Sequence, residues 1–322
     1  MISFEQLTKN IIVHNEQGYA LYYYENGEVI EKVYGKLDIN KDEKISFDSN
    51  FRLASVSKQF VAYSIIDLIN KNKLTLDTVI KTLYPELPSY FNDITVKHLL
   101  NHTSGIYDYE DMKHEEDVQI KDTDIIKFLK TTDKTYFKPG SNYQYSNTGY
   151  ILLGLIIEKV SNRAIKDYIE NEVFAKAKMN DSKVNLQGIT NILRRAYGHV
   201  IDEKGNLEMK DQYWCSATIG DGGLYSSIND LKKWCIYLSN SNIFNIMKVP
   251  NYINENTYNE YGYGIRNINV NGKEIIYHCG STIGTNTILL FSKDYNICLL
   301  FLTNINNIDT TIMKDNLVEY LK

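Results

Sequence analysis

The sequence contains no run of lysine and arginine, no long apolar run, and little proline or cysteine. Its 35 basic and 40 acidic residues give a net charge of −5, which argues against nucleic acid or an anionic membrane as the main partner. The longest apolar stretch, Tyr150 to Ile157, is too short to span a bilayer. The first residues, Met1 to Asn10, show no basic segment followed by an apolar one. We therefore expect a soluble, cytoplasmic protein that binds neither nucleic acid nor a membrane.

Metal and redox motifs are also missing. The four cysteines are Cys215, Cys235, Cys279 and Cys298, and none has the Cys-x-x-Cys spacing of a zinc ribbon or a thioredoxin-type motif. His98 and His102 share the spacing of one helix face without a third ligand, so we expect them to cap and pack the loop at Thr103. Asp38 to Asp42 opens like a calcium loop, yet Glu43 stands where that motif requires glycine. The sequence predicts no metal and no cofactor.

Strand patterns are present at both ends of the chain, and helical patterns lie between them. Residues 18–24 and 28–34 read as two strands joined by an Asn-Gly hairpin signal. Val29 and Val33 fit a sheet with one covered face. Further strand patterns lie at 273–278, 286–292 and 297–303, and helical patterns lie at 4–12, 55–69, 96–100, 124–130, 148–164 and 309–321.

This order predicts an α+β fold. One antiparallel β-sheet, built from the two ends of the chain and flanked by the N- and C-terminal helices, would carry an inserted, mostly helical region. We expect residues 1–75 and 200–322 to form a discontinuous α/β sandwich domain, and residues 76–199 to form a helical domain. A cleft would then lie where the insert meets the sheet.

Ser55-Val56-Ser57-Lys58 is the only Ser-x-x-Lys in the chain, and it stands where the first long helical pattern begins. A serine and a lysine three residues apart share one face of a helix. A hydroxyl is a poor nucleophile until a base takes its proton, and an amine can do so once burial lowers its pKa. The motif predicts a nucleophile, Ser55, with a base one turn later. The alternative is an ordinary helix start with a solvated lysine.

Two further motifs support the first interpretation. Tyr145-Ser146-Asn147 lies in a loop that leads into a helical pattern. The other Tyr-x-Asn triplets of the chain do not have this context. His278-Cys279-Gly280 ends a predicted strand, and Gly280 removes the side chain where an acyl group must lie against the backbone. A Cys–His dyad is not expected, because neighbouring side chains of a strand point to opposite faces.

These motifs, in this order, resemble those of the penicillin-binding-protein and serine β-lactamase superfamily, closest to its class C β-lactamase, esterase and D-aminopeptidase branch. The stretches Phe51 to Phe60, Ile94 to Ile106, Gly222 to Ser227 and Tyr261 to Gly264 agree, so the resemblance runs from about residue 18 to residue 303. It implies a β-lactamase/transpeptidase-like fold.

The resemblance also implies the catalytic roles. Ser55 would form the acyl-enzyme, while Lys58 and Tyr145 would share proton transfer. A tyrosine with a pKa of about 10 and a lysine with one of about 10.4 are both poor bases at neutral pH. Placed together they titrate as a unit, so the sequence leaves open which of the two is the general base.

The remaining positions of the motifs would bind substrate. Asn147 would hydrogen-bond an amide or carbonyl oxygen, and the backbone N–H groups of Ser55 and Ser281 would form the oxyanion hole. His278 would close the site beside Gly280. β-Lactamases of this superfamily usually carry lysine at that position, whereas histidine is largely neutral near pH 7. This departure favours an esterase or peptidase over a β-lactamase.

We therefore expect a serine hydrolase that acylates on Ser55. Its substrate would be a small ester, an amide or a D-amino-acid peptide, with β-lactam hydrolysis less favoured. One alternative uses the same residues: a penicillin-binding-like protein that is acylated by a β-lactam or peptide but turns over little. A catalytically silent scaffold is the third. The sequence does not indicate an oligomeric state, and it shows acidic residues between 108 and 117 without revealing whether they line the cleft.

Overall fold

A computed structural model describes residues 1–11, 18–112, 118–254 and 257–322. Its main feature is a six-stranded sheet in the order β10-β11-β12-β13-β1-β2, in which all neighbours pair antiparallel. The strands are β1 (Tyr19–Glu25), β2 (Glu28–Tyr34), β10 (Arg266–Val270), β11 (Lys273–Thr282), β12 (Thr285–Ser292) and β13 (Ile297–Thr303). Because β1 pairs with β13, the two ends of the chain build one sheet, and the predicted α+β class is confirmed.

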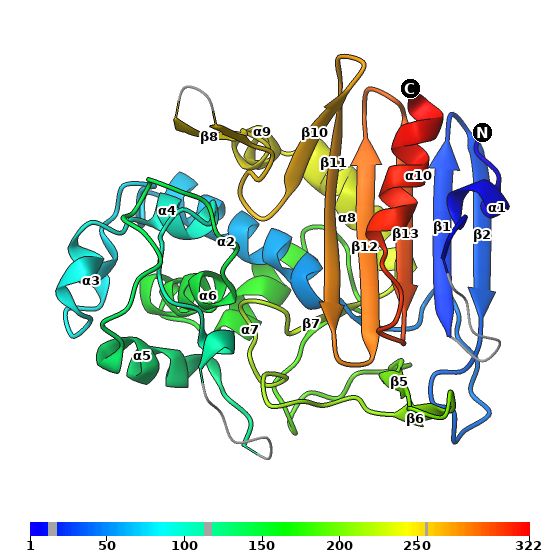
Figure 1. Ribbon diagram of the computed structural model, residues 1–322, viewed down its shortest axis with the longest axis horizontal. Helices are drawn as coiled ribbons and strands as arrows, with labels where there is room; N and C mark the ends of the chain where they lie inside the picture. The colour runs from blue at the N-terminus through cyan, green and yellow to red at the C-terminus, as the bar shows by residue number, and fades with distance from the viewer. Residues whose placement is uncertain (12–17, 113–117, 255–256) are drawn as a thin grey trace.

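Helices cover both faces of this sheet (Figure 1). On one face, α1 (Phe4–Leu7) and α10 (Thr311–Leu321) pack over side chains such as Leu21 and Leu299. On the other, α8 (Ile228–Ser239) belongs to the cluster that contains Leu300. Successive strand residues thus serve two separate cores, as the pleat requires. The first helix is shorter than the predicted 4–12: it ends at Leu7, and residue 12 lies outside the described residues.

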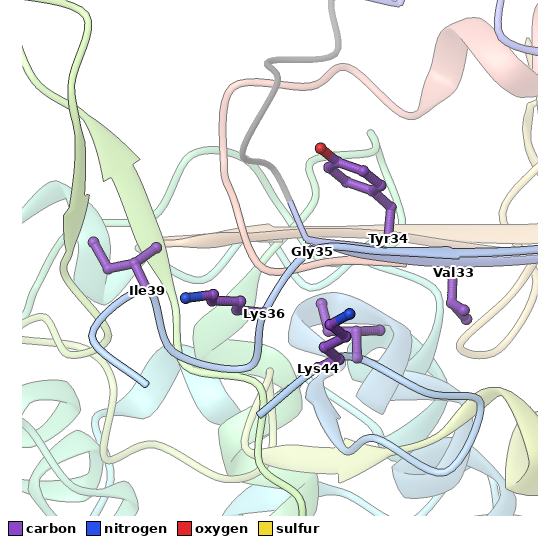
Figure 2. Close-up of a pocket in the computed structure, with 7 residues that line it drawn as sticks. Val33, Tyr34, Gly35, Lys36, Ile39 and Lys44 are labelled. Atoms are coloured by element: carbon purple, nitrogen blue, oxygen red, sulfur yellow. The ribbon is translucent and has the colours of Figure 1, made fainter. Parts of the chain in front are cut away.

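The strand β2 departs from the sequence prediction. The hairpin before it is present, with Asn26 and Gly27 both at positive φ. However, Val29 and Val33 are 47% and 41% exposed, so the covered face predicted for them is wrong. The physical reason is that β2 is the outermost strand of the sheet. At the end of β2, Val33 and Tyr34 point to opposite sides of the strand (Figure 2). A pocket of about 480 Å³ lies there, and Lys36, Ile39 and Lys44 also line it.

The inserted region is mostly helical. It and its surroundings contain α2 (Lys58–Asn70), α3 (Ile80–Leu83), α4 (Val96–Leu100), α5 (Asp122–Thr131), α6 (Asn147–Ser161), α7 (Ile165–Tyr168), α9 (Asn242–Met247), the 3₁₀ turns η1 (Ala54–Ser57), η2 (Ser89–Asn92) and η3 (Tyr109–Asp111), and the π-helical η4 (Ile169–Phe174). Helices α2 and α6 pack on each other and are apolar nearly all round, which is why both are buried. The helix α6 ends at Ser161 rather than at residue 164, because Asn162 adopts the left-handed conformation that terminates helices.

Short strands complete the fold. They are β3 (Phe51–Arg52), β4 (Lys183–Val184), β5 (His199–Ile201), β6 (Leu207–Met209), β7 (Leu224–Ser226), β8 (Asn251–Asn254) and β9 (Thr257–Asn259). Strand β7 pairs with both β3 and β4, although no strand is predicted near residue 183. The domain boundaries at residues 75 and 200 stay a prediction. In the described part of the chain, no helix has the length and apolarity needed to cross a membrane.

Candidate active site

Ser55 lies on the tight turn η1 between strand β3 and helix α2. The turn is hydrogen-bonded to β7 on both sides: Leu53 N donates to Leu224 O at 2.8 Å, and Leu224 N donates to Ser57 Oγ at 3.2 Å. Ala54, directly before the serine, has φ +47°, a left-handed conformation that costs a non-glycine residue about 1–2 kcal/mol. The surrounding hydrogen bonds therefore hold Ser55 in a turn that the chain would not adopt alone.

Lys58 opens helix α2 and is completely buried. Its Nζ donates to Ser55 Oγ at 3.1 Å and to Asn147 Oδ1 at 2.7 Å. A third hydrogen bond goes to the backbone oxygen of Asp221 at 2.9 Å. Burial lowers the pKa of Lys58 to about 8, against the opposing charges of Asp221, Glu110 and Asp108. The serine and lysine predicted as a pair are thus in direct contact, and the solvated-lysine alternative is wrong.

Tyr145 packs beside this pair. Lys58 Nζ lies 4.8 Å from the centre of the phenol ring. Burial raises the pKa of Tyr145 far above its ordinary value, although Ser55 and Arg266 act in the opposite direction. The phenol is therefore neutral near pH 7 and is suited to donate a proton. Of the two candidate bases that the sequence left open, the geometry and charge favour Lys58.

His278 and Gly280 face these residues from strand β11. Nδ1 of His278 is 2.6 Å from the backbone oxygen of Cys279, which can only accept, so this nitrogen carries the proton. The other nitrogen, Nε2, then accepts from the Tyr261 hydroxyl at 3.1 Å. Burial, followed by the charges of Lys58 and Arg266, lowers the pKa of His278 to about 3. The neutral histidine expected from the sequence is what the surroundings enforce.

Glycine is required at position 280 for a reason that the sequence does not reveal. A Cβ placed on it would lie 2.3 Å from Leu53 O, 2.5 Å from Thr287 Oγ1 and 3.0 Å from Ser55 N. The missing side chain therefore allows β11 to press its backbone against the nucleophile turn, and it does not open space for an acyl group. The same approach places the backbone of Gly280, the residue before Ser281, next to the Ser55 N–H.

A cleft of about 880 Å³ joins the two sides. The predicted residues that line it are Ser55, Tyr145, Asn147, His278, Gly280 and Ser281, and Lys58 lies beneath it, bonded to the serine. The structure thus brings all seven predicted site residues together. It adds Glu110 and Arg266 to the lining, which motif matching alone does not single out.

The two histidines considered as metal ligands have structural partners instead. His98 Nδ1 accepts from Thr95 N at 3.2 Å as a helix cap, and His102 Nδ1 accepts from Ser146 N at 3.1 Å. Within residues 1–11, 18–112, 118–254 and 257–322, no group of three or more histidine, cysteine or acidic side chains could hold a metal ion. Cys279 packs against the core under α10, on the face of the strand opposite to His278. Burial raises its pKa to about 11, which leaves it an unreactive thiol near pH 7.

An α+β fold with a Ser-x-x-Lys pair at a helix entrance, facing a glycine-bearing strand of an antiparallel sheet, is the architecture of β-lactamase/transpeptidase-like proteins. The chain belongs to the beta-lactamase family, whose model matches residues 4–320. The superfamily expected from the motifs is confirmed.

Among curated relatives, penicillin-binding protein 4* of Bacillus subtilis is 29% identical over 305 residues, covering 87% of this chain and 66% of that protein. Protein flp of Staphylococcus aureus is 25% identical over 333 residues, covering 94% and 64%. This chain therefore spans just under two thirds of the length of these relatives.

Solved structures share the fold. An octameric penicillin-binding protein homologue from Pyrococcus abyssi superposes with a TM-score of 0.80 at 24% identity, covering 94% of this chain and 73% of that chain. A D-amino acid amidase from Ochrobactrum anthropi, complexed with D-phenylalanine, gives 0.79 at 22% identity, covering 98% and 95%.

The close approach of β11 to the nucleophile turn is testable by Gly280→Ala. The added methyl would overlap two oxygens, and such overpacking costs about 1–3 kcal/mol. We expect the free energy of unfolding in urea to fall by that amount. The matched control is Gly222→Ala, whose Cβ would meet Ala54 at an ordinary 3.5 Å. Equal stability of both variants would show that the contact at Gly280 is not tight.

Proposed function

We propose that the protein is a serine hydrolase that forms an acyl-enzyme on Ser55 and acts on a small ester, an amide or a D-amino-acid peptide. The observation that carries the proposal is the buried Lys58 amine, hydrogen-bonded to Ser55 Oγ at 3.1 Å. Membership of the beta-lactamase family supports it. So does the cleft, since Ser55 lines it and a substrate could reach the hydroxyl.

The contacts of Lys58 favour it as the general base. Asn147 Oδ1 and Asp221 O accept from two directions around Nζ. In the neutral amine the two remaining protons keep those bonds, and the lone pair is directed at the Ser55 hydroxyl. Lys58 then takes the hydroxyl proton as Ser55 Oγ attacks the substrate carbonyl carbon.

The later steps follow from the same geometry. The oxyanion would lie between the backbone N–H groups of Ser55 and Ser281. As the tetrahedral intermediate collapses, the carbonyl carbon's bond to the leaving group breaks, and the leaving group takes a proton from the Lys58 ammonium, directly or through the neutral Tyr145 phenol. Water then attacks the acyl carbonyl carbon as Lys58 accepts one of its protons. When this second tetrahedral intermediate collapses, the bond from the carbon to Ser55 Oγ breaks, Lys58 returns that proton to Ser55, and the acid product leaves.

The charges in the cleft limit the range of substrates that it suits. His278 is neutral and cannot supply the fixed positive charge that suits a substrate carboxylate. The guanidinium of Arg266 in the cleft lining is already paired with Glu260 at 3.3 Å. Glu110 reaches solvent in the cleft wall beside Asn147, and burial together with Asp108 and Asp221 raises its pKa to about 7. Its carboxylate suits the ammonium of a substrate with a free amino group, such as a D-amino-acid amide. The D-amino acid amidase of the same fold is in line with this choice.

A second candidate is an acylated binding protein with little turnover, since one curated relative is named a penicillin-binding protein. Release of product in repeated cycles favours the hydrolase, whereas a long-lived adduct favours the binding protein. The cytoplasmic location and the absence of a nucleic-acid partner stay predictions from the sequence.

Intact-protein mass after treatment with a fluorophosphonate probe tests the nucleophile. We expect one adduct on the wild type and none on Ser55→Ala, because only an activated hydroxyl attacks the probe. Ser64→Ala is the matched control, since that buried serine merely donates to Phe60 O within helix α2. An adduct that survives in Ser55→Ala would contradict the assignment.

The pH dependence of labelling tests the base. Since the neutral amine is the active form and its pKa is about 8, the labelling rate of Ser55 should be low at pH 6 and rise through pH 8 to a plateau. The rate constant of labelling is measured at a series of pH values between about 6 and 10. The midpoint of the rate–pH curve is the pKa of the base. A rate that is constant over this range would exclude Lys58 as the base.

Glu110→Gln tests the choice of substrate. A hydrogen bond to a charged group contributes about 1.5–3 kcal/mol, so kcat/KM for a D-amino-acid amide should fall about tenfold or more. Hydrolysis of a neutral acetate ester should change far less. Asp111→Asn is the matched control, because that carboxylate is engaged by the Tyr136 hydroxyl outside the cleft lining. An equal loss with both substrates would mean that Glu110 does not recognise the amino group.

A further inference from the structure

The loop before strand β7, residues 216–223, runs tightly between the nucleophile turn and helix α6. A Cβ on Gly220 would lie 2.4 Å from Tyr150 O, so only glycine permits this approach to the helix backbone. The buried Arg52 holds the loop from the other side, donating to Ser216 O at 3.1 Å and to Gly222 O at 3.3 Å. The peptide of Asp221 is therefore fixed in place between two of the elements that form the site.

Asp221 itself is 6% exposed and contacts the site in two ways. Its backbone oxygen accepts from Lys58 Nζ at 2.9 Å. Its carboxylate faces Tyr109, whose hydroxyl donates to Oδ2 at 2.9 Å, while Oδ1 is buried without a hydrogen-bond partner. A buried carboxylate with a single donor is costly unless a positive charge lies nearby.

Lys58 provides that charge. Three carboxylates act on its amine, with Asp221 the strongest, followed by Glu110 and Asp108. Two neutral histidines also face the amine: His278 from strand β11 and His102 from the loop after α4. Burial, followed by the charge of Lys58, lowers the pKa of both rings. The rings of Tyr145 and Tyr150 lie 4.8 and 5.6 Å from Nζ.

We propose that Asp221 is a positioning residue, which fixes the Lys58 amine through its backbone oxygen and supplies the counter-charge that determines the pH at which Lys58 becomes a base. The proposal rests on the proposed function, since it concerns the base of the same acylation step. Tyr109 supports it by holding the carboxylate in place while remaining a neutral donor, because burial and Asp221 raise the pKa of its phenol.

The test is the pH dependence of Ser55 labelling by the fluorophosphonate probe in Asp221→Asn. The backbone oxygen stays, and only the charge is removed. An opposite charge at close range shifts the pKa of its neighbour by about 1–3 units. We therefore expect the midpoint of the rate–pH curve to move to lower pH by about one unit, and labelling near pH 7 to become faster, by up to about tenfold.

Asp48→Asn is the matched control, because it removes one negative charge from an exposed position. Its midpoint should equal that of the wild type. A merely structural role of Asp221 would lower the rate equally at every pH with the midpoint unchanged, and that result would overturn the proposal. If Asp221→Asn does not fold by circular dichroism, the smaller Asp221→Ser serves for the same measurement.

The hydrolase activity and the role of Asp221 can be refuted separately. No adduct on the wild type would refute the proposed hydrolase. An adduct on the wild type, with the midpoint unmoved in a folded Asp221 variant, would refute only the role of Asp221.

Discussion

The burial of one amine is the constraint on which the rest of this site depends. Lys58 Nζ is enclosed without contact with solvent, and a buried ammonium is stable only when its protons find acceptors. Its three acceptors are Ser55 in the nucleophile turn, Asn147 at the start of α6 and Asp221 in the loop before β7. These segments are far apart in the sequence, so the amine is satisfied only when the whole fold has assembled. The same burial lowers the pKa of the amine toward neutrality, so that the packing of the core and the reactivity of the serine have one cause.

The two walls of the cleft differ in charge for a related reason. Burial, followed by the charges of Lys58 and Arg266, lowers the pKa of His278, so the strand wall presents a neutral histidine where β-lactamases usually have lysine. The opposite wall carries Glu110, whose carboxylate ionises near pH 7. The other cation of the lining, Arg266, is paired with Glu260. A cleft arranged in this way attracts a substrate amino group more readily than a substrate carboxylate. This asymmetry supports an amidase or esterase acting on amino-acid derivatives over an enzyme specialised for β-lactams.

The sequence predicted the parts of the molecule that local patterns encode. The hairpin at Asn26, the paired strands at both ends and the helix beginning near Ser55 follow from periodicity and turn residues, and the motif order indicated the superfamily. Contacts between distant segments could not be predicted in this way. Local alternation says nothing about which strand lies outermost, so the exposure of Val33 was missed. Likewise, a motif position does not show that Gly280 is required by Leu53 O, or that Asp221 faces Lys58, because those neighbours come from other parts of the chain.

Lys58 can activate Ser55 only if its amine loses its proton near neutral pH. A direct titration of that amine is the most decisive measurement. In protein labelled with ¹³C at the lysine Cε, the Lys58 signal is identified by its absence in Lys58→Met, and its chemical shift is followed as the pH is raised. We expect a midpoint near pH 8. A lysine that stays protonated to about pH 10, as in a solvated chain, would contradict it and would require another base for the serine.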